Sequence, residues 1–291
     1  MLVMKVIKYF LQSLFIYSFF ITIKIFGLRL SRKMFSFLFK LIGPSLKSEQ
    51  TINNNLEKFL GPYNDDIKKN IKLKMWSNYG KTFVEYLYLK KFKTTYSHIK
   101  IKGEETLNNI QKNNKPVIFV SGHFANFELM SMELTKKNIN LATIYRPLNN
   151  FFLNPFMEYI RKKYICQNQI KKGLGGVKDS INYIKNNFSI ALMIDQRVSE
   201  GKRLPFFEHM ALTTTLPAQI ALKFDLDIVP IYIARDHNDH FEMEIYNPIK
   251  ISNNEDAETN KLNISIKLNK ILEEMVSRDP GQWIWTHNRW K

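Results

Sequence analysis

Short apolar runs alternate with amphipathic stretches along the second half of the chain. The continuous runs Val117–Val120 and Ser189–Ile194 are typical of strands buried on both faces. The stretches between such runs carry apolar residues three and four positions apart, which is the helical period. This alternation predicts an α/β fold with a largely parallel central sheet flanked by helices.

The same patterns give approximate positions for the elements. Apolar stripes over residues 51–96 predict helices, which Gly61-Pro62 interrupts. Strands are predicted at 98–101, 117–120, 141–145, 164–166, 189–194, 228–234 and 240–246. Later helices are predicted at 104–113, 127–137, 150–163, 176–187, 215–224 and 259–276. Because no repeat or low-complexity linker interrupts this region, we expect residues 46–291 to form one domain.

The N-terminal segment has a different pattern. Between Lys8 and Lys24 every residue is uncharged, and snorkelling lysines would extend this apolar stretch to about 20 residues, enough for a membrane-spanning helix. A cleaved signal peptide is the alternative, but no small-x-small site follows Ile23. Basic and aromatic residues then interleave up to Lys47, as in helices that lie against anionic headgroups. We therefore expect residues 1–45 to anchor the chain, with the catalytic part in the cytoplasm.

The net charge of the chain favours a negatively charged partner. The formal net charge is +17, and only nine of the 43 basic residues are Arg. This excess is either a feature of a Lys-rich composition or a sign of anionic lipid, phosphate-bearing substrate or nucleic acid as the partner. No recognised nucleic-acid-binding module accompanies the charge, so we do not expect nucleic acid to be the partner. The single cysteine, Cys166, excludes an internal disulfide and is expected to be a packed thiol.

The strongest candidate for chemistry follows the strand at 117–120. His123 comes just after the strand, where ligands bind in open α/β sheets, and Glu128 comes five residues later. If Asn126 caps a helix beginning at Phe127, the loop histidine and the first-turn glutamate can meet. The carboxylate would then hold the imidazole in one tautomer, and the free ring nitrogen would act as a general base. A structural histidine is the alternative.

The other motifs in the sequence do not indicate a catalytic site. His237 and Glu242 repeat the spacing, but they lie in a polar turn and on a solvent-facing strand, so we interpret them as a hairpin tip. The chain has no GxSxG elbow and no Walker loop, and Gly173–Gly176 does not fit a dinucleotide-binding spacing. A base without a protein nucleophile suggests direct attack by a substrate hydroxyl. We expect no metal and no organic cofactor.

Several ordered blocks resemble the late acyltransferases of lipid A biosynthesis, also named the lauroyl/myristoyl acyltransferase family. The blocks are Gly122–Leu129, Tyr145–Leu148, Asp195–Arg197, Pro205–Phe207, Thr213–Ala218 and Pro280–Lys291. The resemblance runs from the anchor to the last residue. It departs at Phe127, Ala125 and Glu208, where tryptophan, glycine and glycine are common, and these departures leave the acyl-chain length open.

The resemblance implies a membrane-bound enzyme on the cytoplasmic side of the bacterial inner membrane. Such an enzyme moves a fatty acyl chain from acyl carrier protein to a hydroxyl of a lipid A precursor of the Kdo-lipid IVA type. The family's essential residues correspond to His123 and Glu128, its downstream arginine to Arg161, and its block aspartate to Asp195. We group Arg161 with Arg146, Asp195, Asn126 and Gln196 as candidates for binding substrate or the oxyanion.

The chemistry of each of these side chains favours a different role. A planar guanidinium suits phosphate or oxyanion binding, which favours Arg146 and Arg161. For Arg289 we expect a surface salt bridge. Trp283 and Trp285 alternate as in a strand and are expected to pack in the core. Two other interpretations stay open, namely an enzyme of this family with another glycolipid or aminolipid acceptor, or a catalytically inactive lipid-binding homologue.

Overall fold

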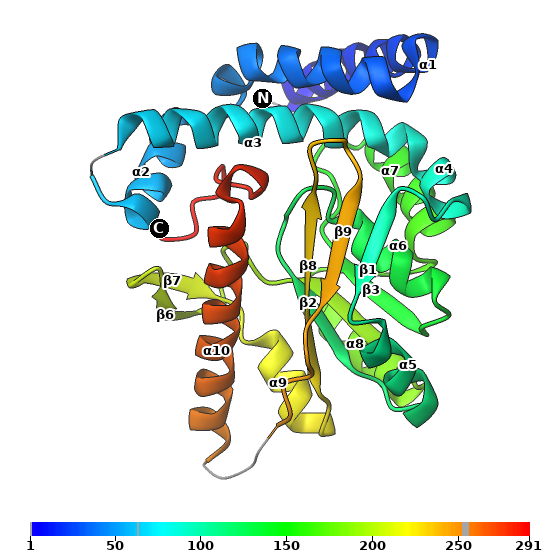
Figure 1. Cartoon of the computed structure of the whole chain (residues 1–291), viewed down its shortest axis with the longest axis vertical. Coiled ribbons are helices and arrows are strands. Elements are labelled where there is room, and N and C mark those ends of the chain that lie inside the picture. The colour runs from blue at the N-terminus through cyan, green and yellow to red at the C-terminus, as the bar shows by residue number, and fades with distance from the viewer. Residues whose placement is uncertain (1, 63, 252–255) are drawn as a thin grey trace.

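The computed structural model describes residues 2–62, 64–251 and 256–291 and contains a seven-stranded sheet between helical layers (Figure 1). The strands are β1 (Ile99–Lys102), β2 (Ile118–Ser121), β3 (Leu141–Tyr145), β4 (Asn168–Lys171), β5 (Ser189–Met193), β6 (Lys202–Phe206), β7 (His209–Thr213), β8 (Ile228–Arg235) and β9 (Phe241–Ile245). The helices are α1 (Leu2–Leu46), α2 (Glu49–Leu60), α3 (Asp65–Glu85), α4 (Leu89–Thr94), α5 (Glu104–Asn113), α6 (Glu128–Lys136), α7 (Asn154–Ile160), α8 (Leu174–Lys185), α9 (Leu216–Phe224) and α10 (Ala257–Arg278). Short helical turns lie at η1 (Tyr86–Tyr88), η2 (Arg161–Ile165) and η3 (Pro280–Gln282).

The sheet has the order β1-β9-β8-β2-β5-β3-β4. The five strands from β8 to β4 run parallel, whereas β8 and β9 form an antiparallel hairpin. Strand β1 pairs in parallel with β9 at the edge. This arrangement confirms the predicted α/β fold with a largely parallel sheet.

Alternate residues of the central strands supply two separate cores. On β2, Ile118 and Val120 point to one face and Phe119 to the other, as the twofold period of a strand requires. The first face packs against α9 and α10, and the second against α5 and α6 (Figure 1). Because both faces are covered, the central strands are apolar throughout, and this explains why they could be found in the sequence.

One predicted strand is wrong, and one hairpin was not predicted. The stretch Tyr164–Cys166 is not a strand, because residues 161–165 form the π-helical turn η2, which continues α7, and the sheet strand follows at β4. The β6–β7 hairpin, a separate two-stranded sheet, was not predicted at all. The inner residues of the hairpin pack on α10. Its short strands carry Pro205 and exposed charged residues, so the alternation of apolar and polar residues typical of a strand is hard to see in the sequence.

Candidate active site

The register of the sheet brings His123 and Asp195 together. Ser121 at the end of β2 pairs with Met193 at the end of β5, and the two strands are parallel neighbours. His123 and Asp195 each lie two residues beyond this pair, at the same edge of the sheet. The bond from the Ile194 amide to the Ser121 carbonyl, 2.9 Å long, extends the pairing up to the two side chains.

Asp195 binds His123 at two points. The carboxylate Oδ1 lies 2.8 Å from the imidazole Nδ1, and Oδ2 accepts from the His123 amide at 2.7 Å. Burial opposes ionisation of Asp195, but the neighbouring His123 and its hydrogen bonds outweigh that effect and hold the pKa of the carboxyl well below its usual range. An ionised Asp195 requires the proton on Nδ1, so Nε2 carries the free electron pair of the neutral ring.

A third donor fixes the carboxylate itself. The Trp283 indole donates from Nε1 to Oδ2 of Asp195 at 2.9 Å. Both Trp283 and Asp195 are buried, so this bond is shielded from competing water. The buried Trp283 and Trp285 confirm the prediction that these side chains pack in the core, although they follow η3 in a turn and not in a strand.

The free side of the His123 ring faces an amide and a second imidazole. The Gln196 amide nitrogen lies 3.2 Å from Nε2 of His123 and 3.1 Å from Nε2 of His287. Burial, with weaker contributions from nearby positive groups, lowers the pKa of His287 to about 4. His287 is therefore neutral near pH 7 and can accept one of the two amide protons of Gln196. His287 was not among the residues predicted from the sequence, although it lies in the C-terminal block.

Glu128 has other partners than the expected one. Its Oε1 accepts from Nε and a terminal nitrogen of Arg161, at 2.8 and 2.5 Å, and from the Tyr86 hydroxyl at 2.8 Å. Asp195 thus takes the ring-orienting position that the sequence assigned to Glu128. The reason is geometric, because Glu128 begins α6 and its side chain meets the turn η2 that carries Arg161.

The pair of Glu128 and Arg161 is well shielded. Burial opposes the charge on Arg161, but Glu128 outweighs it, and the pKa of the guanidinium is raised above its ordinary value. Burial next to Glu128 raises the pKa of the Tyr86 hydroxyl, so this phenol stays protonated and donates. The guanidinium also lies 5.7 Å from the centre of the Tyr145 ring.

One cavity of about 340 Å³ unites these groups. His123, Glu128, Arg161, Arg146 and Gln196 all line it, together with His287 and Lys172. The remaining wall is largely apolar, with Phe127, Ile144, Leu148, Leu192, Met193, Val198 and Leu216. The cavity therefore combines basic side chains with an apolar lining, as a ligand with an anionic head and a hydrocarbon chain requires.

Asn126 does not join this cavity, and its expected role as a helix cap is wrong. Phe127 occupies the capping position of α6, without a side-chain bond. The buried Asn126 side chain points the other way and donates to Glu85 on α3 at 2.9 Å. Glu85 is itself fully buried and pairs with Arg32 of α1 and Arg235 of β8.

The loop that carries His123 has a constrained backbone. Ala125 adopts φ = 44°, a left-handed conformation that favours glycine and explains why glycine is common there in the resembling family. Its carbonyl accepts from Thr82 and Asn78 of α3, at 3.1 and 3.3 Å, and its amide donates to Gln282. The loop is thereby held between α3 and the C-terminal segment.

Arg289 is not a surface residue, which corrects the expected salt bridge. Its side chain is completely buried, stacks 3.8 Å from the centre of the Phe206 ring and donates to Asn269 on α10 at 2.6 Å. Burial lowers the pKa of its guanidinium to about 10, against the opposing charges of Asp195 and Glu273. This arginine fastens the C-terminal segment that supplies Trp283 and His287.

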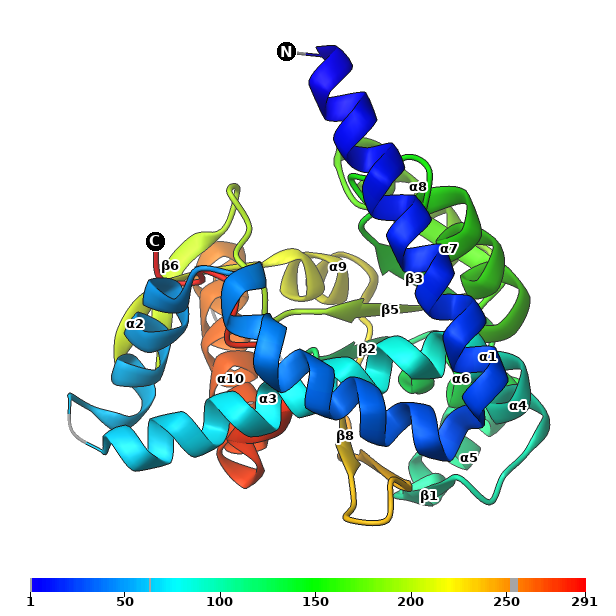
Figure 2. The same ribbon diagram turned by 90° about the horizontal axis from the view of Figure 1, so that it is seen from above.

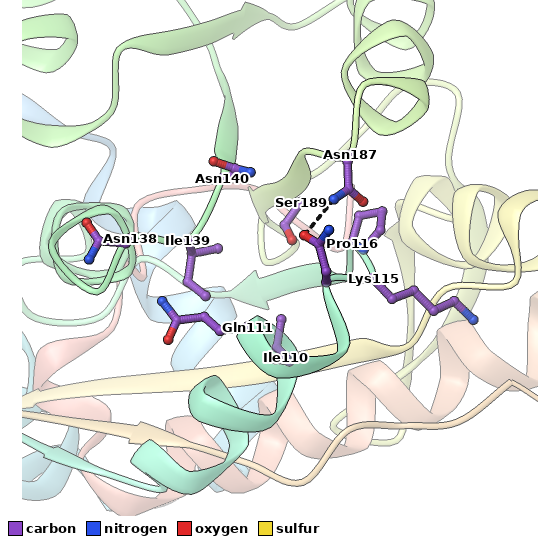
Figure 3. A pocket seen from close by; sticks show the side chains of 10 residues that line it. Ile110, Gln111, Lys115, Pro116, Asn138, Ile139, Asn140, Asn187 and Ser189 are labelled. Atoms are coloured by element: carbon purple, nitrogen blue, oxygen red, sulfur yellow. Dashed lines mark hydrogen bonds between the residues drawn. The ribbon is translucent and has the colours of Figure 1, made fainter.

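A second cavity, of about 210 Å³, lies at the opposite edge of the sheet, where β2 and β5 begin (Figure 3). Asn114, Asn138 and Asn187 line it, and all three have a positive φ just after a helix end. Asn187 donates to Asn114 at 2.8 Å. These asparagines end helices, which accounts for their presence without a ligand.

Comparisons with known proteins indicate a single family. The family model described as bacterial lipid A biosynthesis acyltransferase matches residues 3–291. A curated relative, lipid A biosynthesis acyltransferase 2 of Shigella flexneri, is 22% identical over 187 residues. That alignment covers 63% of this chain and 58% of the relative, which is under two thirds of the relative's length.

Proposed function

Because this chain belongs to the bacterial lipid A biosynthesis acyltransferase family, we propose that it transfers a fatty acyl group to a hydroxyl of a lipid A precursor. The proposed donor is the thioester of acyl carrier protein, and the proposed acceptor is of the Kdo-lipid IVA type. The observation that carries the proposal is the contact of 2.8 Å between His123 Nδ1 and Asp195, which leaves the electron pair of Nε2 to accept a proton in a ring that lines the cavity.

In the proposed reaction, His123 Nε2 takes the proton of the acceptor hydroxyl, whose oxygen attacks the thioester carbonyl carbon. Asp195 holds the ring and balances the imidazolium charge. The carbon–sulfur bond then breaks, the new ester leaves, and the carrier thiolate recovers a proton from the imidazolium. Each proton and bond is accounted for, and no protein nucleophile takes part.

Glu128 and Arg161 have a joint role in this proposal. The buried carboxylate fixes the guanidinium at the cavity wall, where its remaining donors can bind a phosphate of the acceptor or the oxyanion of the tetrahedral intermediate. Arg146, which also lines the cavity, adds a second cation for the acceptor. Gln196 must leave Nε2 of His123 when the hydroxyl arrives, and it can keep its bond to His287.

The site is proposed to work at the cytoplasmic side of the bacterial inner membrane, beside anionic lipids. The apolar stretch in α1 is long enough to cross a membrane by length and composition. It supports membrane association at the end of the molecule where the sheet's carboxyl ends lie (Figure 1).

The test is transfer by the full-length protein in detergent, using acyl carrier protein loaded with chains of several lengths and lipid A precursors as acceptors. We expect an acylated lipid A precursor with wild-type protein and none with His123→Ala. Transfer only to another glycolipid or to an aminolipid would establish the related activity instead. Binding of lipid without any transfer would establish an inactive homologue.

A further inference from the structure

Helix α1 is two helical arms joined at a sharp bend. Gly27 has φ = 73° and ψ = 172°, which is not helical and is a region that residues other than glycine rarely enter. The first arm, 2–26, and the second arm, 28–46, diverge from this point and both lie across the same end of the molecule (Figure 2). Seen from the side, α1 lies directly above α3 and does not rise away from the fold (Figure 1), and from above the N-terminal turns of its first arm extend beyond the neighbouring ribbons (Figure 2).

Polar groups of both arms face the rest of the protein. On the first arm, Ser13 bonds Asn150 at 3.1 Å and the Tyr17 hydroxyl donates to the Phe152 carbonyl at 3.2 Å. On the second arm, Arg32 pairs with buried Glu85 at 2.8 Å. Each arm is therefore held along its length by specific contacts and not only at one end.

The outer faces of both arms are apolar, the reverse of a helix on a water-soluble protein. Of 24 large hydrophobic residues exposed in the described part of the chain, 16 lie on α1. On the second arm they are Leu46 and four residues that follow one another at helical spacing, Leu30, Met34, Phe37 and Leu41. On the first arm they include Val3, Ile7, Phe10, Leu14, Ile21 and Ile25. An apolar surface of this extent requires an apolar environment.

Cations flank the apolar stripe of the second arm. Arg29, Lys33 and Lys40 each precede one of its members by one residue and are exposed. One residue is about 100° around a helix, so these cations form a row beside the stripe and not within it. This is the arrangement of a helix at the membrane surface, with its apolar face among acyl chains and its cations at the headgroups.

The apolar surface continues to the cavity. Phe151 and Phe152 pack edge-on against Tyr9 and Phe10 of the first arm. In the same loop, Leu148 is exposed and lines the cavity that contains His123. A lipid in the same leaflet could thus pass from the surface around α1 into the cavity without crossing water.

We propose that α1 docks both arms in the plane of one anionic leaflet, with the bend at Gly27 and the Leu148–Phe152 loop sharing that surface. The occupant of the apolar face is the bilayer, and the N-terminus stays on the same side as the catalytic domain. This places the chain on the membrane and not across it. The inference rests on the geometry of α1 and holds whether or not the proposed acyl transfer is correct.

Single-cysteine labelling in a Cys166→Ser background tests the topology. Lys5→Cys reports the start of α1, and His237→Cys, in the exposed β8–β9 turn, marks the side of the catalytic domain. With a membrane-impermeant maleimide, we expect both positions to react in inside-out vesicles and neither in right-side-out vesicles. Opposite sidedness of Lys5→Cys and His237→Cys would overturn the proposal in favour of a spanning helix.

A depth measurement covers the case in which Lys5→Cys is shielded. Leu14→Cys and Phe37→Cys would carry an environment-sensitive dye in phosphatidylglycerol vesicles that contain shallow or deep spin-labelled lipids. In-plane docking predicts that the shallow label quenches both positions about twofold or more better than the deep label. The exposed Met210→Cys, outside α1, is the unquenched control. Stronger deep quenching at Leu14→Cys, or no quenching at either arm position, would contradict docking.

Discussion

At the scale of residues, the candidate site depends on how five buried or half-buried side chains share protons. Asp195 accepts from both the ring and the amide of His123 and from Trp283, so the imidazole has one orientation and one tautomer. Gln196 then joins the free ring nitrogen to His287. This geometry predicts the effects of single substitutions.

Asp195→Asn should lower kcat strongly while the fold remains. An amide of the same shape can present its NH₂ group to Nδ1, which favours the wrong tautomer and removes the charge that balances the imidazolium. We expect a loss of at least about 100-fold in kcat with little change in KM. Steady-state kinetics and the far-UV spectrum measure the two properties. Activity within a few-fold of wild type would show that another group orients His123.

His287→Asn should reduce the loss of stability that the folded protein suffers in acid. The pKa of His287 is lowered from 6.5 to about 4, so the unfolded chain takes up this proton first and the folded state loses stability as the pH falls from 6.5 to 4. Each unit by which folding lowers a pKa corresponds to about 1.4 kcal/mol, so the loss is at most about 3 kcal/mol, less what solvent screens at this half-buried position. Denaturant unfolding at pH 7 and pH 4.5 should show a smaller pH-dependent loss in the variant. An equal loss in both proteins would contradict the buried, neutral state of His287.

At the scale of elements, the sequence predicted the helices and strands whose patterns come from burial on known faces. The strands 117–120, 141–145 and 189–194 correspond closely to β2, β3 and β5. The β6–β7 hairpin and the turn η2 were missed because their residues are fixed by contacts with α10 and α6 and not by a local period.

In the candidate site too, residues with a local sequence signal were predicted and those placed by distant contacts were not. His123 was found from its place after a buried strand, but the partner of its ring depended on which strand lies beside β2. That neighbour is β5, some 70 residues later in the chain, and only the strand order reveals it. The sequence did hold a signal for Asp195, because this residue also follows an apolar strand. The carboxyl ends of parallel strands lie at the same edge of a sheet, so residues that follow two such strands can meet. His287 and Arg289 carry no such local signal.

Gly27→Ala tests the bend in α1 at this scale. A methyl group meets open space there, so only the backbone conformation opposes it, and that conformation costs on the order of 1–3 kcal/mol for a residue other than glycine. We expect the two arms to straighten or loosen. In hydrogen exchange on vesicles, the backbone amides of the second arm should then be less protected. Gly175→Ala, also in open space but at an ordinary φ, is the matched control and should change nothing there. Unchanged exchange in Gly27→Ala would show that the bend has no role.

At the scale of the whole molecule, one buried ion cluster joins helix α1 to the candidate site. Glu85 on α3 accepts from Arg32 on α1, Arg235 on β8 and Asn126 in the His123 loop. Four separate parts of the chain thus meet at one carboxylate with no exposed surface. The arrangement couples the placement of α1 to the loop that carries His123.

Glu85→Gln should therefore destabilise the fold and loosen α1 together. The substitution leaves the buried Arg32 guanidinium without its charge partner and leaves Arg235 only Asp239, 3.9 Å away. Breaking a buried pair in this way costs about 3–5 kcal/mol. Denaturant unfolding in detergent measures the loss, and proteolysis near Gly27 measures the release of α1. Glu242→Gln removes the partly exposed pair with Lys102 at 2.8 Å and should cost less than about 1 kcal/mol. If Glu85→Gln cost no more than Glu242→Gln, the cluster would not hold the helix to the site, because a buried carboxylate shared by two arginines must be worth more than a surface pair.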